Sequence, residues 1–251
     1  MITRRNLSLG ALCTALVSNV GSSAQTVDPD QLLEEVTYPS FDALDGRRPF
    51  GYDPASQEEI DIAEQIVART VLGPRPIDIA QSFVDRFYRE HPNWISQWPY
   101  PGHWNPLVVK FFSATSSPPN NDMIPWCAAF ANWCIERAGK KGSRSASSQS
   151  FVDKKFEKIF EKTTEPREGD LAVFTCYSPA GENLGLGHVT FFKGRVSDTV
   201  INVVGGNQAT SGHSSIISAI PFSIADRPTR RHINGSLVQC VMKLNTYIRV
   251  S

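Results

Sequence analysis

The sequence predicts an α+β fold. Apolar residues recur at helical spacing in several segments up to residue 162. After Pro166 the pattern changes to alternation and short apolar runs. Turns that carry Gly or Asp separate these runs, which indicates consecutive strands with short links and therefore an antiparallel sheet. Helices followed by strands argue against a βαβ repeat.

The first residues are typical of a secretory signal peptide, which we assign to residues 1–24. Arg4 and Arg5 precede an apolar run over residues 7–20 that is too short to span a bilayer. A small-residue exit, Ser22-Ser23-Ala24, follows. The string TRRNLSLG resembles a twin-arginine signal, with an ordinary Sec signal as the alternative. The mature protein is expected to be periplasmic or secreted, without a stable membrane span.

Composition excludes some classes of partner. The 251 residues carry 25 basic and 25 acidic side chains, and this balance argues against a nucleic-acid-binding protein. No CxxC pair and no Cys/His cluster with zinc spacing is present, so a structural metal is not expected. Cys176 and Cys240 both fall on predicted strands, and whether they form a disulfide is not readable from the sequence.

The N-terminal half is predicted to be helical. Residues 25–112 are assigned to a linker and helical region, with helices over residues 57–72 and 76–91. Residues 92–106 hold Trp94, Trp98 and Trp104 among prolines and cannot form a long regular element; the aromatics either plug the core or line a sugar-binding groove. A polar loop is expected over residues 113–122, a flexible stretch over residues 140–148, and an amphipathic helix over residues 150–162.

The C-terminal half is predicted to form the sheet. Apolar alternation indicates strands over residues 171–177, 188–196, 200–204, 214–222 and 237–250. A glycine-rich loop is expected over residues 181–187, directly before the second of these strands.

Cys127 is the candidate nucleophile. A buried stripe of residues at helical spacing starts at Cys127 and runs to Ala138, and Pro125 places the helix start near Trp126 or Cys127. A thiol in the first turn feels the positive end of the helix dipole and nearby N–H groups, which favour the thiolate. The alternative is a buried structural cysteine, which fits Cys134 better because it lies mid-helix.

A thiol nucleophile needs a base and a group that orients this base. Of the five histidines, only His188 opens a predicted strand after a glycine-rich loop. The next strand ends in Gly205-Gly206-Asn207-Gln208, so Asn207 is the candidate orienting residue and Gln208 the reserve. On spacing alone, Asn207 as a plain turn residue is the better interpretation.

Four segments in order carry a family resemblance: PWCAAFANWCIERAG, EPREGDLAVF, GHVTFFKG and INVVGGNQ. Together they resemble the circularly rearranged papain-like peptidases of the NlpC and CHAP type, and more closely a bacterial subgroup of cell-wall hydrolases. The resemblance runs from about Asp122 to Gln208. It implies a papain-like core over residues 113–251, with the nucleophile helix packed on an antiparallel sheet and an N-terminal helical extension.

The resemblance also implies function. It implies Cys127 as nucleophile, His188 as general base and Asn207 as orienting residue in hydrolysis of an amide bond of peptidoglycan. This mechanism needs no metal and no organic cofactor, so none is expected. Trp126, Asp122 and Gln208 are the candidates for substrate binding, although Asp122 is also expected to cap the helix. Alternative functions are a cysteine acyltransferase, a toxin-type amidase aimed at a rival's wall, and an inert wall-binding module.

Overall fold

The structure is a computed structural model. It describes residues 54–98, 104–119, 121–122, 124–210, 213–233 and 236–250. The expected signal peptide and the residues that follow it up to residue 53 lie outside the described residues. In the described part of the chain, no helix combines the length and the apolar character that crossing a membrane requires.

The helices start where local sequence signals predict. A capping box of Ser56 and Glu59 opens α2 (Gln57–Ala68), and Pro76 opens α3 (Pro76–Phe87). The side chain of Asn105 caps a short helix that the periodicity did not reveal, α4 (Pro106–Phe111). The remaining helical elements are α5 (Cys127–Arg137) and the 3-10 turns η2 (Pro92–Ile95), η3 (Phe112–Ala114), η4 (Ser148–Val152) and η5 (Lys154–Phe156).

The strands form one curved antiparallel sheet in the order β1-β6-β5-β4-β3-β8-β2, with β7 paired to β8. Their bounds are β1 (Ser96–Trp98), β2 (Phe160–Thr163), β3 (Leu171–Tyr177), β4 (Asn183–Arg195), β5 (Val200–Thr210), β6 (His213–Ser223), β7 (Arg227–Ile233) and β8 (Ser236–Val250). The predicted α+β class and antiparallel sheet are therefore confirmed.

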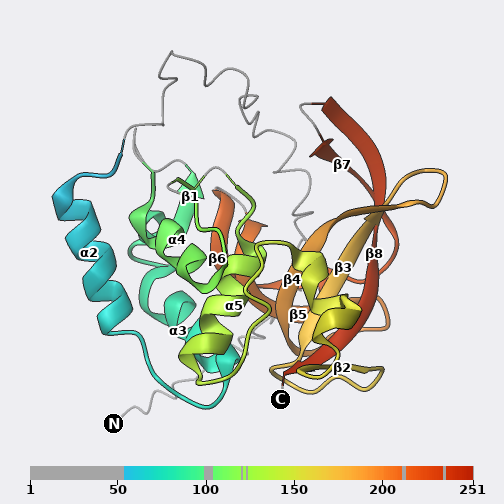
Figure 1. The fold of residues 1–251 in the computed structure, drawn as a ribbon, viewed down its shortest axis with the longest axis horizontal. Helices are drawn as coiled ribbons and strands as arrows, with labels where there is room; N and C mark the ends of the chain where they lie inside the picture. Colours follow the sequence, from blue (N-terminus) through green and yellow to red (C-terminus); the bar gives the residue numbers. More distant parts are fainter. Residues whose placement is uncertain are drawn as a thin grey trace, which may run out of the picture.

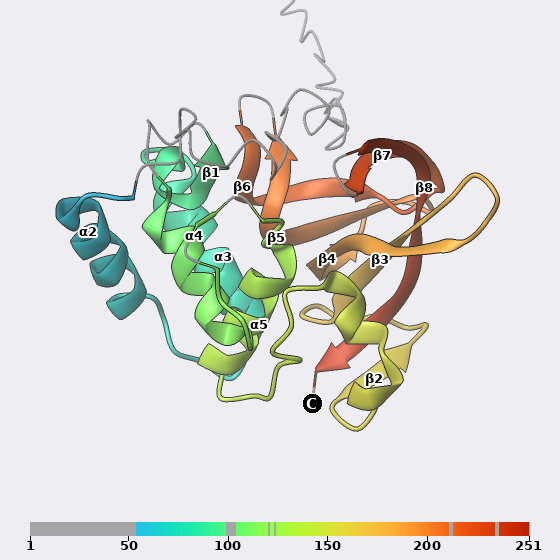
Figure 2. The ribbon, with the colours of Figure 1, turned by 45° about the horizontal axis from the view of Figure 1, so that its top comes forward.

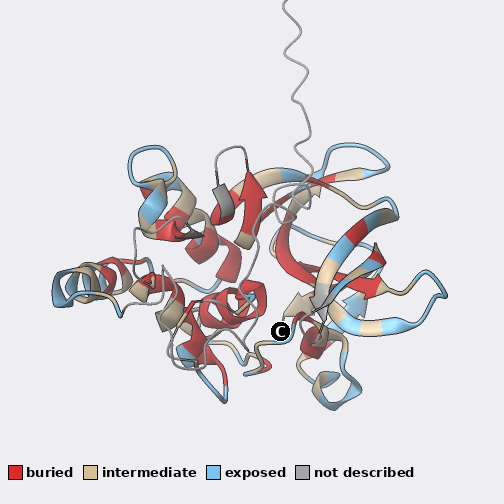
Figure 3. Ribbon diagram, turned by 90° about the horizontal axis from the view of Figure 1, so that it is seen from above, coloured by how far each residue is buried: buried red, intermediate tan, exposed pale blue. Residues whose placement is uncertain are grey.

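Helices cover one side of the sheet (Figure 1), and α5 lies between the other helices and the strands (Figure 2). Residues of α2, α3, α4 and α5 share one hydrophobic cluster with the adjoining face of β3, β4 and β6. A second hydrophobic cluster, which includes Phe174, Phe192 and Phe222, lies on the opposite face of the sheet. Buried residues concentrate where the helices meet the strands (Figure 3). Residues 54–112 therefore build the support of α5.

The prediction of a helix over residues 150–162 is wrong. This segment forms η5 and most of η4, and it then enters the sheet as β2, where Phe160 pairs with Val250 of β8. The apolar spacing was real, since Phe151 and Phe160 are both buried and their rings lie 5.1 Å apart. Pairing with the sheet edge overrides the local periodicity.

The stretch over residues 140–148, expected to be flexible, is tied to α5 through Asn132. The amide nitrogen of Asn132 donates to the carbonyl of Ser145 at 2.9 Å, and its oxygen accepts from the backbone N–H of Ser143 at 2.7 Å. Asn132 is fully buried, so these bonds satisfy a polar group inside the core. The segment thus has one fixed path between α5 and η4.

Candidate active site

Cys127 is the first residue of α5. Trp126 occupies the N-cap position and makes no side-chain capping bond, so the helix start retains backbone N–H groups without an intrahelical acceptor. The expectation that Asp122 caps this helix is wrong. Only 4% of Cys127 is exposed, because the first turn of α5 packs directly on the sheet.

Opposing effects act on the Cys127 thiol. Burial raises its pKa, and this is the largest effect. The backbone N–H groups of Val189, Ala128 and Cys127 lower it, as does the charge of Arg231. The predicted help from the helix start is therefore present, but it is smaller than the desolvation. The net direction is upward, so the helix start alone does not favour the thiolate.

Strand β4 brings His188 to this helix end. The N–H of Val189, the next residue in the chain, faces the Cys127 thiol. The His188 side chain is buried, and its ring stacks on Phe222 of β6, with ring centres 5.7 Å apart and planes 12° apart. His188 also pairs in register with Phe174 of β3. The described contacts of the imidazole thus lie on the side of the second hydrophobic cluster.

The glycine that precedes His188 is required by close packing. A Cβ at Gly187 would overlap the carbonyl oxygen of Phe174 and lie 2.5 Å from the side-chain nitrogen of Gln149. That nitrogen donates to the same carbonyl at 2.8 Å. Gln149 and the Phe174 carbonyl therefore occupy the space beside residue 187, and only a residue without a Cβ fits there.

Strand β5 brings Asn207 to the same helix end. A Cβ at Gly206 would overlap the Trp126 ring and lie 2.9 Å from Cβ of Phe130, so β5 touches the start of α5 directly. Phe191 of β4 pairs with Val204 of β5, and beyond this pair β5 is irregular between Gly205 and Gln208. Asn207 lies at this irregularity inside β5, and His188 lies inside β4, so the prediction that they stand at strand ends is wrong. Asn207 has a positive φ of 57°, an uncommon conformation for a non-glycine residue.

The backbones next to His188 and Asn207 therefore approach the first turn of α5, whereas the described ring contact of His188 lies in the second hydrophobic cluster. The thiol of Cys127 meets the backbone next to His188, and the amide of Asn207 is linked to Trp126 through Ser215. Ser215 had no signal in the sequence, because it is one of several small polar residues in its strand. The same holds for Gln97, whose side-chain oxygen lies 3.3 Å from the indole nitrogen of Trp126.

The residues expected to bind substrate have little exposed surface. Trp126 is fully buried, and Gln208 is 1% exposed. The Gln208 amide is held between Thr190 and Ser218, with its oxygen accepting from Thr190 at 3.0 Å and its nitrogen donating to Ser218 at 2.9 Å. Both side chains use their polar atoms within the protein, which suits a supporting position behind the site.

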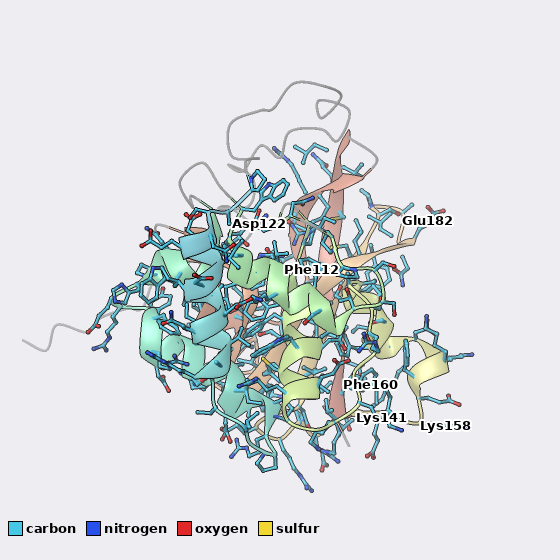
Figure 4. All side chains as sticks on the ribbon, turned by 60° about the vertical axis from the view of Figure 1, so that its left-hand side comes forward. Phe112, Asp122, Lys141, Lys158, Phe160 and Glu182 are labelled. Atoms are coloured by element: carbon cyan, nitrogen blue, oxygen red, sulfur yellow. The ribbon has the colours of Figure 1, made fainter. Side chains whose placement is uncertain are left out.

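Asp122 is also buried. Figure 4 shows it on the helical side of the molecule, away from Glu182. Its carboxylate accepts a hydrogen bond from the backbone N–H of Asn105 at 2.9 Å. The backbone carbonyl of Asp122 accepts a hydrogen bond from the side-chain nitrogen of Gln97. Burial raises its pKa to about 7, although backbone N–H groups act in the opposite direction. Asp122 therefore joins α4 and β1 to the segment that leads into α5.

Among the described residues, no group of three or more His, Cys, Asp or Glu side chains is arranged to hold a metal ion. The described cysteines carry thiols and form no disulfide. Cys134 is fully buried, and burial raises the pKa of its thiol well above the usual range. What the fold and the site define is an α+β protein with a buried thiol at a helix start, packed against a histidine-bearing strand.

Comparison with known proteins relates part of this chain to one domain family. Residues 119–207 match the family model of the CHAP domain, which confirms the resemblance to the CHAP and NlpC-type superfamily over this stretch. The matched residues include Cys127, His188 and Asn207. No curated protein and no solved structure matched the chain. CHAP domains are generally hydrolases that act on peptidoglycan.

Proposed function

We propose that this chain is an exported peptidoglycan hydrolase that cleaves an amide bond, with Cys127 as nucleophile, His188 as general base and Asn207 as the residue that orients the base. The bond lies within the stem peptide or joins N-acetylmuramic acid to L-alanine. The supporting observation is that the CHAP match includes all three residues, and that the Cys127 thiol faces the backbone beside His188. Export and a periplasmic or secreted location follow from the pattern of residues 1–24.

The buried thiol needs a proton acceptor. Since burial raises the pKa of Cys127, the thiolate forms when His188 takes the proton and the two charges stabilise each other. The surrounding N–H groups and the charge of Arg231 favour the same ionised form. In the proposed mechanism, Asn207 accepts a hydrogen bond from the protonated imidazole and keeps its ring in the productive orientation.

In the acylation step, the thiolate of Cys127 acts together with the imidazolium of His188. The sulfur attacks the carbonyl carbon of the scissile amide, and the carbonyl oxygen becomes an oxyanion. The N–H of Cys127, in the first turn of α5, is the donor for this charge, since it has no intrahelical acceptor. The imidazolium of His188 then gives its proton to the leaving nitrogen, the C–N bond breaks, and a thioester remains on Cys127.

Deacylation uses water. His188 takes a proton from a water molecule, whose oxygen attacks the thioester carbonyl. The C–S bond breaks, the carboxylic acid leaves, and the thiol is restored. Overall one amide and one water give one amine and one carboxylic acid, with no change of oxidation state.

The reaction class is tested by digestion of purified peptidoglycan and mass analysis of the products. We expect new amino and carboxyl ends from the wild-type chain and none from Cys127→Ala. Defined muropeptides with and without the muramoyl–alanine bond then identify the bond. New reducing sugar ends, or binding to peptidoglycan without any product, would overturn the proposal.

A further inference from the structure

Next to the proposed site, hydrogen bonds join Trp126, Ser215 and Asn207, and only one assignment of donors and acceptors is possible along them. An indole N–H can only donate, so the 2.9 Å contact between Trp126 Nε1 and Ser215 Oγ makes the serine oxygen the acceptor. The single hydroxyl proton of Ser215 is then directed to Oδ1 of Asn207, at 2.7 Å. Ser215 is 1% exposed and Trp126 is fully buried, so neither bond competes with bulk water.

Residues of the N-terminal helical region hold the Trp126 indole in place. Gln97 of β1 presents its side-chain oxygen to the same indole N–H at 3.3 Å, and its nitrogen donates to the carbonyl of Asp122. The Trp126 ring is also packed against Phe111 of α4, with ring centres 6.0 Å apart. The indole is therefore fixed in position, and so is the acceptor site that it imposes on Ser215.

Asn207 needs such a partner, because its backbone does not fix its side chain. It lies at an irregularity of β5, between Gly205 and Gln208, and has a φ of 57°. The two ends of an amide have nearly the same size, so only hydrogen-bond chemistry decides which end faces which neighbour. A donor at Oδ1 selects one orientation of the amide plane.

We propose that Ser215 is a positioning residue: held by Trp126, it fixes the orientation of the Asn207 amide and, through it, the imidazole of His188. This inference rests on the proposed function. It predicts that loss of the serine hydroxyl lowers the rate of the chemical step while substrate binding is unchanged. A merely structural Ser215 would affect only the folded fraction.

The test compares Ser215→Ala with Ser215→Thr and with a matched control. Ser143 provides this control, because its buried hydroxyl also donates to an asparagine oxygen, Asn132 Oδ1, away from the first turn of α5. Each variant is assayed on a defined muropeptide, with rates expressed per folded protein. If Ser215→Ala does not fold, Ser215→Cys replaces it, since a thiol is a weak donor of similar size.

We expect Ser215→Ala to lower kcat by about tenfold to a hundredfold with KM unchanged, as small misplacements of a catalytic group do. The basic limb of the pH profile should move to lower pH, since an imidazolium without a well-oriented acceptor loses its proton more easily. Ser215→Thr should restore most of the rate, and Ser143→Ala should keep the wild-type kcat. In an Asn207→Ala background, Ser215→Ala should cost nothing further.

Two results would overturn the inference alone: a kcat for Ser215→Ala equal to that of Ser143→Ala, or a full additional loss in the Asn207→Ala background. Cys127→Ala, run in parallel, tests the proposed function separately. If it is inactive while Ser215→Ala behaves like the control, the proposed function stands and the inference fails. If Cys127→Ala is as active as wild type, both fail.

Discussion

Substitution of Asp122 by Asn should change how stability depends on pH. The folded protein raises the pKa of this carboxyl from 3.8 to about 7 by burial, so between these values the folded chain holds a proton that the unfolded chain has released. Stability from this group is therefore fully present below pH 3.8 and is lost as the pH rises to about 7. The shift corresponds to about 4 kcal/mol at 1.36 kcal/mol per pKa unit.

The assay is urea unfolding of wild type and Asp122→Asn at several pH values from about 4 to about 8. An asparagine cannot titrate, and its oxygen can still accept the Asn105 N–H. The difference in unfolding free energy should therefore move in favour of the variant by about 4 kcal/mol across this range. Any cost of the new amide nitrogen is independent of pH and cancels in this change. Asp61→Asn, at an exposed carboxylate, is the control. A difference between wild type and Asp122→Asn that stays constant with pH would refute the reasoning.

Further substitutions test packing and anchoring. Gly206→Ala brings a Cβ to 2.9 Å from Cβ of Phe130, so urea unfolding should show a loss of about 1–3 kcal/mol. Gly194→Ala, with nothing within 4 Å of its added Cβ, should change stability by less than about 0.5 kcal/mol; equal losses would contradict this account of β5 against α5. Asn132→Ala leaves the buried Ser143 N–H without its acceptor, which should cost about 1–3 kcal/mol. Trypsin should then cleave after Lys140 and Lys141 faster than in wild type, and an unchanged cleavage rate would argue against the anchoring role of Asn132.

Much of the fold could be predicted because its elements carry local signals. The capping residue Ser56, the first-turn proline Pro76 and the alternation from Leu171 onward each act within a few residues of the element they define. The predictions that failed concern strands that form only by pairing with residues far away in the sequence. Phe160 belongs to a strand only because Val250 lies at the sheet edge. The segment Arg227–Ile233 is polar and gives no strand signal, and it becomes β7 by pairing with β8.

The site follows the same rule. The spacing around Cys127 predicted the helix start, and the structure begins α5 at that residue. The burial that raises the pKa of the thiol could not be predicted, because it depends on how tightly β4 packs on the helix. Ser215 acquires its place from the indole of Trp126, far away in sequence. Asp122 resembled a helix cap in sequence, but the structure directs its carboxylate to Asn105.

The central claim is that the sulfur of Cys127 carries the reaction. Its most direct test is the turnover of a defined muropeptide by Cys127→Ala and by Cys134→Ala, each at a known concentration of folded protein. Both replace a buried thiol of the same helix by the same residue, so they share the cost of a small cavity. The account predicts no detectable amide cleavage by Cys127→Ala and a wild-type rate per folded molecule for Cys134→Ala. Cleavage by Cys127→Ala at the wild-type rate would contradict it.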